Sequence, residues 1–211
     1  MRLERSTYPQ VEAYLEGNDT VLMLFGSTEQ HGRHNPLGTD SFAPQKLSEL
    51  IEKDLPGLLI APILPFGSSP RFVEFPGTFN LGDQLYLAVV KKLCENLYDQ
   101  GFRHFVFLNG HGGNSKALTE CQLDLAKKGC RAALLNCDDM PSVHFDTVKY
   151  KGVSVTVPRP TNYYAENGWI GPDDPKKASA EWGREMLETV AAWMVDFIQA
   201  FSKTPLPDSE D

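Results

Sequence analysis

The sequence lacks the features that would place the protein in a membrane or on a nucleic acid. No apolar run approaches the roughly 20 residues that a membrane-spanning helix needs, and residues 1–5 are not followed by the apolar stretch of a secretory signal. Basic residues are in the minority, with 20 Lys and Arg against 28 Asp and Glu and a formal net charge of -8. Such an acidic balance argues against a nucleic-acid groove or an anionic membrane surface as the main partner. We therefore expect a cytoplasmic protein with no nucleic-acid or membrane partner.

Cysteine is scarce and shows no pairing pattern. The chain has no Cys-x-x-Cys pair, and its four cysteines are scattered: Cys94, Cys121, Cys130 and Cys137. Their mostly apolar or helical surroundings are typical of buried, reduced thiols. The sequence therefore predicts no disulfide framework.

The composition is that of an ordinary globular domain. Hydrophobic residues make up 41% and charged residues 23% of the 211 residues, which is close to the usual range for a domain with a sizeable core. A chain of this length suits one domain. We expect residues 1–201 to form that domain and the polar residues 202–211 to be a flexible tail.

Short apolar runs alternate with amphipathic stretches along the chain. The predicted strands are 21–25, 58–61, 104–108, 131–136 and, half exposed, 152–157. The predicted helices are 6–16, a helix after Asp40 that ends near Asp54, 83–100, 115–128 and 176–201. This alternation predicts an α/β fold with an open, mostly parallel sheet and helices on both of its faces.

Two of these helices have predicted inward faces. After Asp40 the inward residues are Phe42, Leu47, Leu50 and Ile51. In the closing helix they are Met186, Leu187, Val190, Trp193, Met194, Phe197 and Ile198.

A polar loop with metal-ligand side chains follows the first predicted strand. It carries Glu29, His31, His34 and Asp40 within a short stretch. Carboxylates and imidazoles at such spacing bind zinc, manganese or iron, and open α/β sheets place ligands where strands end. The alternative is a surface loop with chance histidines.

A second loop, residues 109–114 (Asn-Gly-His-Gly-Gly-Asn), follows the strand at 104–108. It lacks the lysine and the glycine spacing of nucleotide-binding loops. Glycines on both sides of His111 allow a sharp turn and leave the imidazole free to project into a crowded site. The alternative is a structural turn with an incidental histidine.

The two loops should meet at the same edge of the sheet. Glu29, His31, Asp40 and His111 would then supply four ligands for one or two divalent ions, with zinc, manganese and iron(II) all compatible. A water bound to such an ion, with its pKa lowered toward about 7, is a nucleophile at neutral pH. His34 is either a neighbour of this site or an exposed loop residue, whereas His104 should be structural.

Four stretches resemble the creatininase family of metal-dependent amidohydrolases. Residues 26–32 with 37–40 resemble its first metal motif, and residues 109–114 resemble its second. Residues 75–78 (Phe-Pro-Gly-Thr) match its central loop, and residues 167–172 leading into 177–183 resemble its C-terminal stretch. The four matches occur in the family's order from about residue 20 to residue 200.

The resemblance implies a three-layer α/β fold, a homo-oligomer such as a hexamer, and a centre of two divalent metal ions. It also implies hydrolysis of a cyclic amide or formamide C–N bond in a small polar substrate. Carried over by motif, Glu29, His31, Asp40 and His111 would be the metal ligands, with Asp40 as the bridge.

The chain departs from the family pattern at its expected catalytic segment. Members usually carry a His-Ala-Gly-Glu stretch running into Glu-Thr-Ser, which supplies a further ligand and an acid/base pair. Residues 141–146 are the nearest and a poor match, the chain is shorter than typical members, and Phe72 stands where the central loop often has His. Glu74 or His144 could take over the acid/base role.

Three functions are consistent with these residues. The first is metal-dependent hydrolysis of an amide. The second is a relative that binds metal without hydrolysis, and the third is a non-hydrolytic reaction, such as an isomerisation, at the same metal centre.

Overall fold

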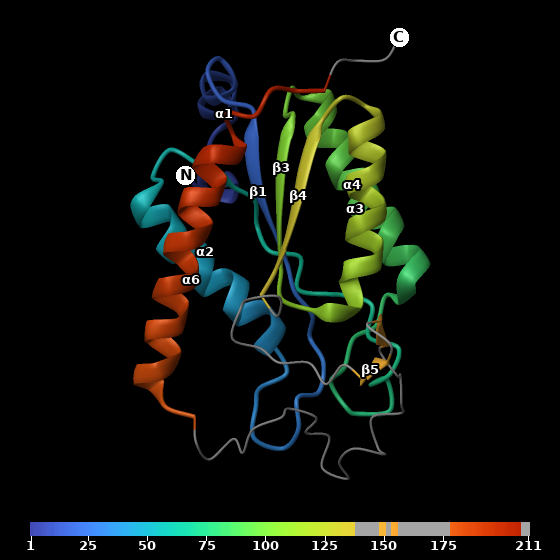
Figure 1. The fold of residues 1–211 in the computed structure, drawn as a ribbon. Helices are drawn as coiled ribbons and strands as arrows, with labels where there is room; N and C mark the ends of the chain where they lie inside the picture. Colours follow the sequence, from blue (N-terminus) through green and yellow to red (C-terminus); the bar gives the residue numbers. More distant parts are fainter. Residues whose placement is uncertain (138–147, 151–152, 156–177, 208–211) are drawn as a thin grey trace.

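A four-stranded parallel sheet forms the centre of the molecule (Figure 1). Its strands run in the order β2 (Leu59–Ile60), β1 (Thr20–Phe25), β3 (His104–Asn109) and β4 (Arg131–Asn136). The computed structural model describes residues 1–137, 148–150, 153–155 and 178–207 of the chain. The four predicted strands of the sheet are confirmed to within one or two residues at each end.

Helices cover both faces of this sheet, as the alternation of the sequence predicts (Figure 1). One layer consists of α2 (Thr39–Asp54) and α6 (Ala180–Phe201), and the other contains α3 (Gly82–Asp99) and α4 (Ser115–Lys127). The shorter α1 (Tyr8–Leu15) precedes β1. The three-layer α/β prediction is therefore confirmed.

Four short elements complete the described chain. Two 3-10 turns occupy Leu3–Arg5 and Gly112–Asn114. An antiparallel hairpin joins β5 (Val148–Tyr150) and β6 (Val153–Val155). The strand predicted at 152–157 corresponds to β6, and its remaining positions lie outside the described residues.

Each face of the sheet has its own hydrophobic core. In β1, Val21, Met23 and Phe25 pack toward α3 and α4, whereas Leu22 and Leu24 pack toward α2 and α6. All five side chains are buried, and burying one such side chain contributes about 1.5–3 kcal/mol. The continuous apolar run in the sequence thus reflects a strand that is covered on both sides.

Phe42 and Trp193 do not face inward, so their prediction as core residues was wrong. Their side chains are 54% and 51% exposed. Phe42 precedes the buried Leu47 by five positions, a rotation of roughly 140° at 3.6 residues per turn. Trp193 lies beside the buried stripe of α6, and its ring stacks on Phe197 with 5.6 Å between centroids. A helix with apolar residues on more than one face does not show from its sequence which face is covered.

The carboxyl ends of β1, β2 and β3 meet at one edge of the sheet. Phe25 pairs with Asn109 in the parallel register, and the N–H groups of Gly110 and Gly26 donate to the carbonyls of Phe25 and Leu64. The loop from β2 to α3 contains turns and bends but no regular helix or strand. These contacts hold three loops side by side at the edge where the sequence predicts the site.

Candidate metal centre

The four predicted metal ligands come from two loops and one helix terminus. Glu29 and His31 lie on the loop after β1, Asp40 is in the first turn of α2, and His111 follows β3. The N–H of Glu29 donates to the carbonyl of Leu37, which closes the first loop. A carboxylate is also favoured by the partial positive charge of a helix N-terminus, so α2 stabilises Asp40 where it stands.

The structure brings these four side chains together. Nε2 of His31 lies 2.8 Å from Oδ1 of Asp40, and Nδ1 of His111 lies 2.9 Å from Oδ2 of the same carboxylate. Nδ1 of His111 is also 3.4 Å from Oε1 of Glu29. One ligand atom from each of Glu29, His31 and Asp40 can be chosen so that all three lie within 4.8 Å of one another.

Backbone carbonyls determine which imidazole nitrogens face this cluster. Nε2 of His111 is 2.9 Å from the carbonyl oxygen of Ser68, and Nδ1 of His31 is 3.1 Å from the carbonyl oxygen of Glu29. Since a carbonyl only accepts, both of these nitrogens must carry hydrogen. The other nitrogen of each neutral ring therefore presents a lone pair to the carboxylates, the arrangement that metal-binding histidines adopt.

The same proximity perturbs the titration of the cluster. Burial by itself lowers the pKa of His111, but its interactions with Asp40 and Glu29 outweigh burial and raise the pKa to about 10. Burial likewise opposes the shift of His31, whose pKa is raised by Asp40. Burial would raise the pKa of Asp40, yet the two histidines hold that pKa below its ordinary value. Without a metal ion, a proton therefore occupies the nitrogen of His111 that faces the carboxylates at neutral pH.

Two buried carboxylate oxygens show that these residues fit a cation. Neither Oε2 of Glu29 nor Oδ2 of Asp40 has a hydrogen-bond partner among the described residues, although Oδ2 of Asp40 has the close ionic contact with His111. Buried charges that lack partners are costly, and a divalent ion supplies the missing one. Oxygen and imidazole donors without thiolate suit zinc, manganese and iron.

Two glycines allow the backbone to approach this closely. A Cβ at Gly110 would collide with the backbone oxygen of Asp40 and would lie 2.7 Å from Cγ of Pro44. A Cβ at Gly113 would collide with the carbonyl oxygen of Ser68 and with Nε2 of His111. Gly110 is thus required by its close approach to α2, and Gly113 by its close approach to Ser68 and His111.

The other predicted site residues either lie elsewhere on the described loops or fall outside the described residues. His34 is exposed in the turn after His31. Glu74 is exposed in the loop between β2 and α3, and within the described part of the chain no hydrogen bond or ion pair joins it to the four ligands. His144 lies outside the described residues.

Ser68 and Asn114 are the residues that sequence reasoning missed. Ser68 acts through its backbone carbonyl, and both side chains are almost fully buried, at 2% and 0% exposure. A backbone acceptor has no residue-type signal in a sequence. Asn114 could have been identified from the sequence, because it is a polar residue at the end of the loop that contains His111.

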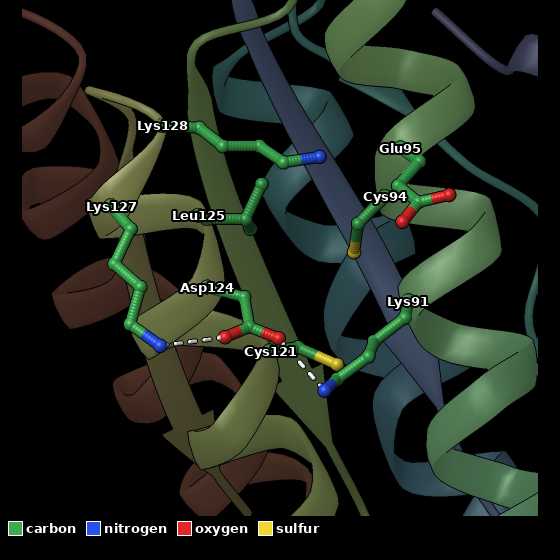
Figure 2. A pocket seen from close by; sticks show the side chains of 8 residues that line it. All are labelled: Lys91, Cys94, Glu95, Cys121, Asp124, Leu125, Lys127 and Lys128. Carbon is green, nitrogen blue, oxygen red and sulfur yellow. Dashed lines mark hydrogen bonds and ion pairs between the residues drawn. The ribbon is translucent and has the colours of Figure 1, made fainter.

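A separate cavity of about 210 Å³ lies between α3 and α4 (Figure 2). Cys94 and Cys121 line it, and Asp124 at its rim pairs with Lys91 and Lys127. Burial raises the pKa of both thiols, that of Cys121 to about 12. None of the four cysteines forms a disulfide, and Cys94 and Cys121 remain protonated at neutral pH, which makes them poor nucleophiles. No helix of the described chain is long and apolar enough to cross a membrane.

Comparisons with known proteins agree with the family resemblance of the sequence and with the fold. The family model for creatininase, described as creatinine amidohydrolase, matches residues 4–155. A mycofactocin precursor peptide peptidase from Mycobacterium tuberculosis (strain CDC 1551 / Oshkosh) is 33% identical over 56% of this chain and 50% of that protein. Creatinine amidohydrolase from Pseudomonas putida is 32% identical over 60% and 50% of the two chains. A 3-dehydro-scyllo-inosose hydrolase from Thermotoga maritima is 29% identical over 50% and 34%. The chain spans about half the length of the first two relatives.

Solved structures share the fold. A creatinine amidohydrolase (creatininase) crystal structure superposes with a TM-score of 0.77 at 23% identity, covering 96% of this chain and 98% of that one. A manganese form of creatininase gives the same TM-score at 22% identity, covering 96% and 99%. At this level of identity the likeness concerns the fold alone.

Proposed function

The chain belongs to the creatininase family, and from that premise we propose that it is a metal-dependent amidohydrolase. The substrate we propose is a small polar molecule with a cyclic amide or formamide C–N bond. Creatinine amidohydrolase of Pseudomonas putida is one of the relatives that support this class. The mycobacterial peptidase supports peptide bonds as a further class of candidate substrate.

One observation carries the proposal. Two imidazole lone pairs and two carboxylates, all electron donors, face the same small space. Because Ser68 and Glu29 hold the histidines in this orientation through their carbonyls, the neutral rings cannot turn a donor N–H inward without losing a hydrogen bond. Such a group is stable only around protons or a cation, which supports Glu29, His31, Asp40 and His111 as metal ligands.

The two carboxylates have different proposed roles in the metal centre. A divalent ion bound there would polarise a substrate carbonyl and acidify a water. Asp40 directs one oxygen to each histidine, and we therefore propose it as the bridge if two ions bind. Glu29 supplies a second buried carboxylate, which offsets the charge of the ions. Zinc, manganese and iron(II) are the proposed metals.

Glu74 and His144 are the proposed acid/base residues. Glu74 lies on the loop that also carries Ser68, and its carboxylate is exposed to solvent. His144 is proposed on its residue type alone.

Metal analysis combined with turnover tests the proposal. Purified protein should bind one or two equivalents of zinc or manganese per chain, and the metal-loaded protein should hydrolyse a cyclic amide, a formamide or a short peptide. The variants His31→Ala and His111→Ala should lose both metal and activity. Full metal occupancy in both variants would show that the site is wrong.

Phe72 favours a second candidate function. This half-buried phenylalanine stands where the family's central loop often has a histidine, so that position cannot supply a ligand or proton donor. A protein that binds metal without hydrolysis, or that runs an isomerisation at the metal, would retain the ligands and lack amide cleavage. Metal binding without turnover of any of the three substrate classes would favour it, and product analysis would identify an isomerisation.

We further propose that the protein is cytoplasmic and forms a homo-oligomer, with a hexamer as the expected size. Light scattering of the purified protein measures that size directly.

A further inference from the structure

Ser68 uses all of its polar atoms to connect the metal centre to the surrounding structure. Its carbonyl oxygen accepts from Nε2 of His111 at 2.9 Å, and its N–H donates to Oδ1 of Asn114 at 3.2 Å. Its hydroxyl donates to Asp83, in the first turn of α3. The position of this serine therefore sets the orientation of the His111 ring.

Asn114 connects the same serine to the two neighbouring loops. Its Nδ2 donates to the carbonyl oxygen of Gly26 at 3.0 Å, where the loop bearing Glu29 begins. It also donates to Oδ1 of Asn109 at 3.3 Å, and that oxygen accepts the backbone N–H of His111 at 3.2 Å. Asn114 is fully buried, so its side chain is shielded from solvent. Its hydrogen bonds are to the loops that follow β1 and β2 and to Asn109 at the end of β3.

The backbone around Ser68 is shaped for this contact. A Cβ at Gly67 would lie 2.5 Å from Oδ1 of Asn114 and 3.0 Å from Cδ2 of His111. A side chain at that position would push the two residues away from the loop. Glycine allows the amide and the imidazole to approach the loop together.

We propose that Asn114 is a positioning residue for the metal centre. Through Ser68 and Asn109 it keeps Nδ1 of His111 directed at Asp40 and Glu29, and it touches none of the ion's proposed ligand atoms itself. The proposal rests on the proposed function, because it gives Asn114 its role through the metal ligands. Asp83 supports the same serine from α3.

Asn114→Ala tests this proposal against a matched control, Asn80→Ala, on the loop that carries Ser68. Oδ1 of Asn80 accepts the N–H of Ser69 at 2.8 Å, next to the N–H that Asn114 accepts, but Asn80 is exposed and, within the described part of the chain, forms no hydrogen bond with a ligand residue. The hydroxyl of Ser69 lies 3.4 Å from Nε2 of His111, a longer contact than the 2.9 Å of the Ser68 carbonyl. Zinc affinity is measured by competition with a chromophoric chelator, and folding by thermal denaturation of the metal-free variants. We expect Asn114→Ala to lower zinc affinity about 10- to 100-fold, as losses of such outer contacts do, and Asn80→Ala to leave it nearly unchanged. Equal zinc affinities in the two folded variants would overturn the proposal.

Two further comparisons separate the possible failures. If His111→Ala also leaves zinc affinity unchanged, the proposed metal centre itself is wrong, whereas a loss in His111→Ala without one in Asn114→Ala refutes only the role of Asn114. If Asn114→Ala does not fold, the exposed Asp83 provides the test, since Asp83→Asn keeps an acceptor for the Ser68 hydroxyl and Asp83→Ala removes it. Weaker zinc binding in Asp83→Ala than in Asp83→Asn supports the positioning network, and equal binding overturns it.

A spectroscopic measurement reports on orientation directly. In the zinc-loaded protein, the His111 ring should give the nitrogen NMR signature of an Nε2–H tautomer with a slowly exchanging proton. Asn114→Ala should speed that exchange, because the Ser68 carbonyl is no longer held in place. Unchanged exchange in a folded Asn114→Ala protein would contradict the proposal.

Discussion

Nδ1 of His111 lies 2.9 Å from Oδ2 of Asp40, although the two residues follow different strands of the sheet. Asp40 belongs to the helix that covers one face, and His111 to the loop that leads to a helix on the other face. The contact therefore joins the two layers at the edge of the sheet. Changes at either residue should affect both metal binding and the way the layers are held together.

Metal binding should release protons from the protein. The pKa of His111 is raised to about 10, so below that pH the metal-free imidazole is charged, and an ion must displace its proton. Zinc affinity should therefore rise with pH between about 6 and 10. Calorimetric titrations in two buffers of different ionisation enthalpy measure the number of protons released. A binding enthalpy that does not depend on the buffer would contradict the expectation.

The stability of the metal-free protein should fall as the pH rises, whereas zinc affinity should increase. A histidine with a raised folded-state pKa contributes stability that is fully present below its unfolded pKa of about 6.5. That contribution is lost as the pH rises through about 10. Urea unfolding of chelator-treated protein at several pH values should show this decline, and His111→Gln should show less of it.

Removing the charge of Asp40 should lower the pKa of both His31 and His111. Asp40→Asn keeps the shape of the side chain but removes the carboxylate that raises the pKa of His31 and His111. We expect both pKa values to fall and zinc binding to weaken by at least about tenfold. NMR titration of the histidine rings measures the first effect. Unchanged ring titrations would show that Asp40 does not interact with them in solution.

The sequence predicts much of this fold because its signals are local. The apolar runs around Leu22, Val106 and Leu134 mark strands, and the glycines at 101 and 129 follow helix ends. Because carboxyl ends of parallel strands share an edge, the proximity of His111 to Asp40 could also be predicted.

Contacts that use the backbone, or that depend on which helix face is covered, could not be predicted. The carbonyl of Ser68 orients His111, and any residue at that position has a carbonyl. Trp193 is apolar yet exposed, because the sheet covers the neighbouring stripe of α6. The acid/base role of Glu74 stays a prediction.

Gly110 should tolerate no side chain. A Cβ there would collide with the backbone of Asp40 and with Pro44, and such overpacking costs about 1–3 kcal/mol. Gly110→Ala should therefore lower both unfolding stability and zinc affinity. Gly17 provides the control, since a Cβ at that position meets no heavy atom within 4 Å. Gly17→Ala should change stability by about 0.5 kcal/mol or less, and a similar loss in the two variants would contradict the packing argument.

Glu74→Gln should separate catalysis from metal binding. If Glu74 transfers protons, the amide of the glutamine that replaces it cannot do so. General acid–base catalysis typically contributes about 10²- to 10⁴-fold in rate. The variant should then lose turnover while zinc affinity stays unchanged, because Glu74 makes no contact with the described ligands. The exposed Glu49 pairs with Lys46, and Glu49→Gln is the control for loss of a surface carboxylate. Full turnover in Glu74→Gln would remove Glu74 from the mechanism.

His104 and His111 stand at opposite ends of β3, and their substitution should affect zinc affinity differently. His104 is buried at the start of the strand, with Nδ1 2.7 Å from Oδ1 of Asp19 and Nε2 2.9 Å from the carbonyl oxygen of Thr204. Its ring also packs edge-on against Phe201, at the end of α6. His104→Ala leaves two partners without hydrogen bonds, so we expect a loss of about 2–3 kcal/mol in unfolding free energy and normal zinc affinity. His111→Ala should abolish zinc binding and should also destabilise the metal-free protein, because it leaves the buried carboxylates of Glu29 and Asp40 without their ion pair. Zinc binding that is lost in His104→Ala and retained in His111→Ala would place the site at the wrong end of the strand.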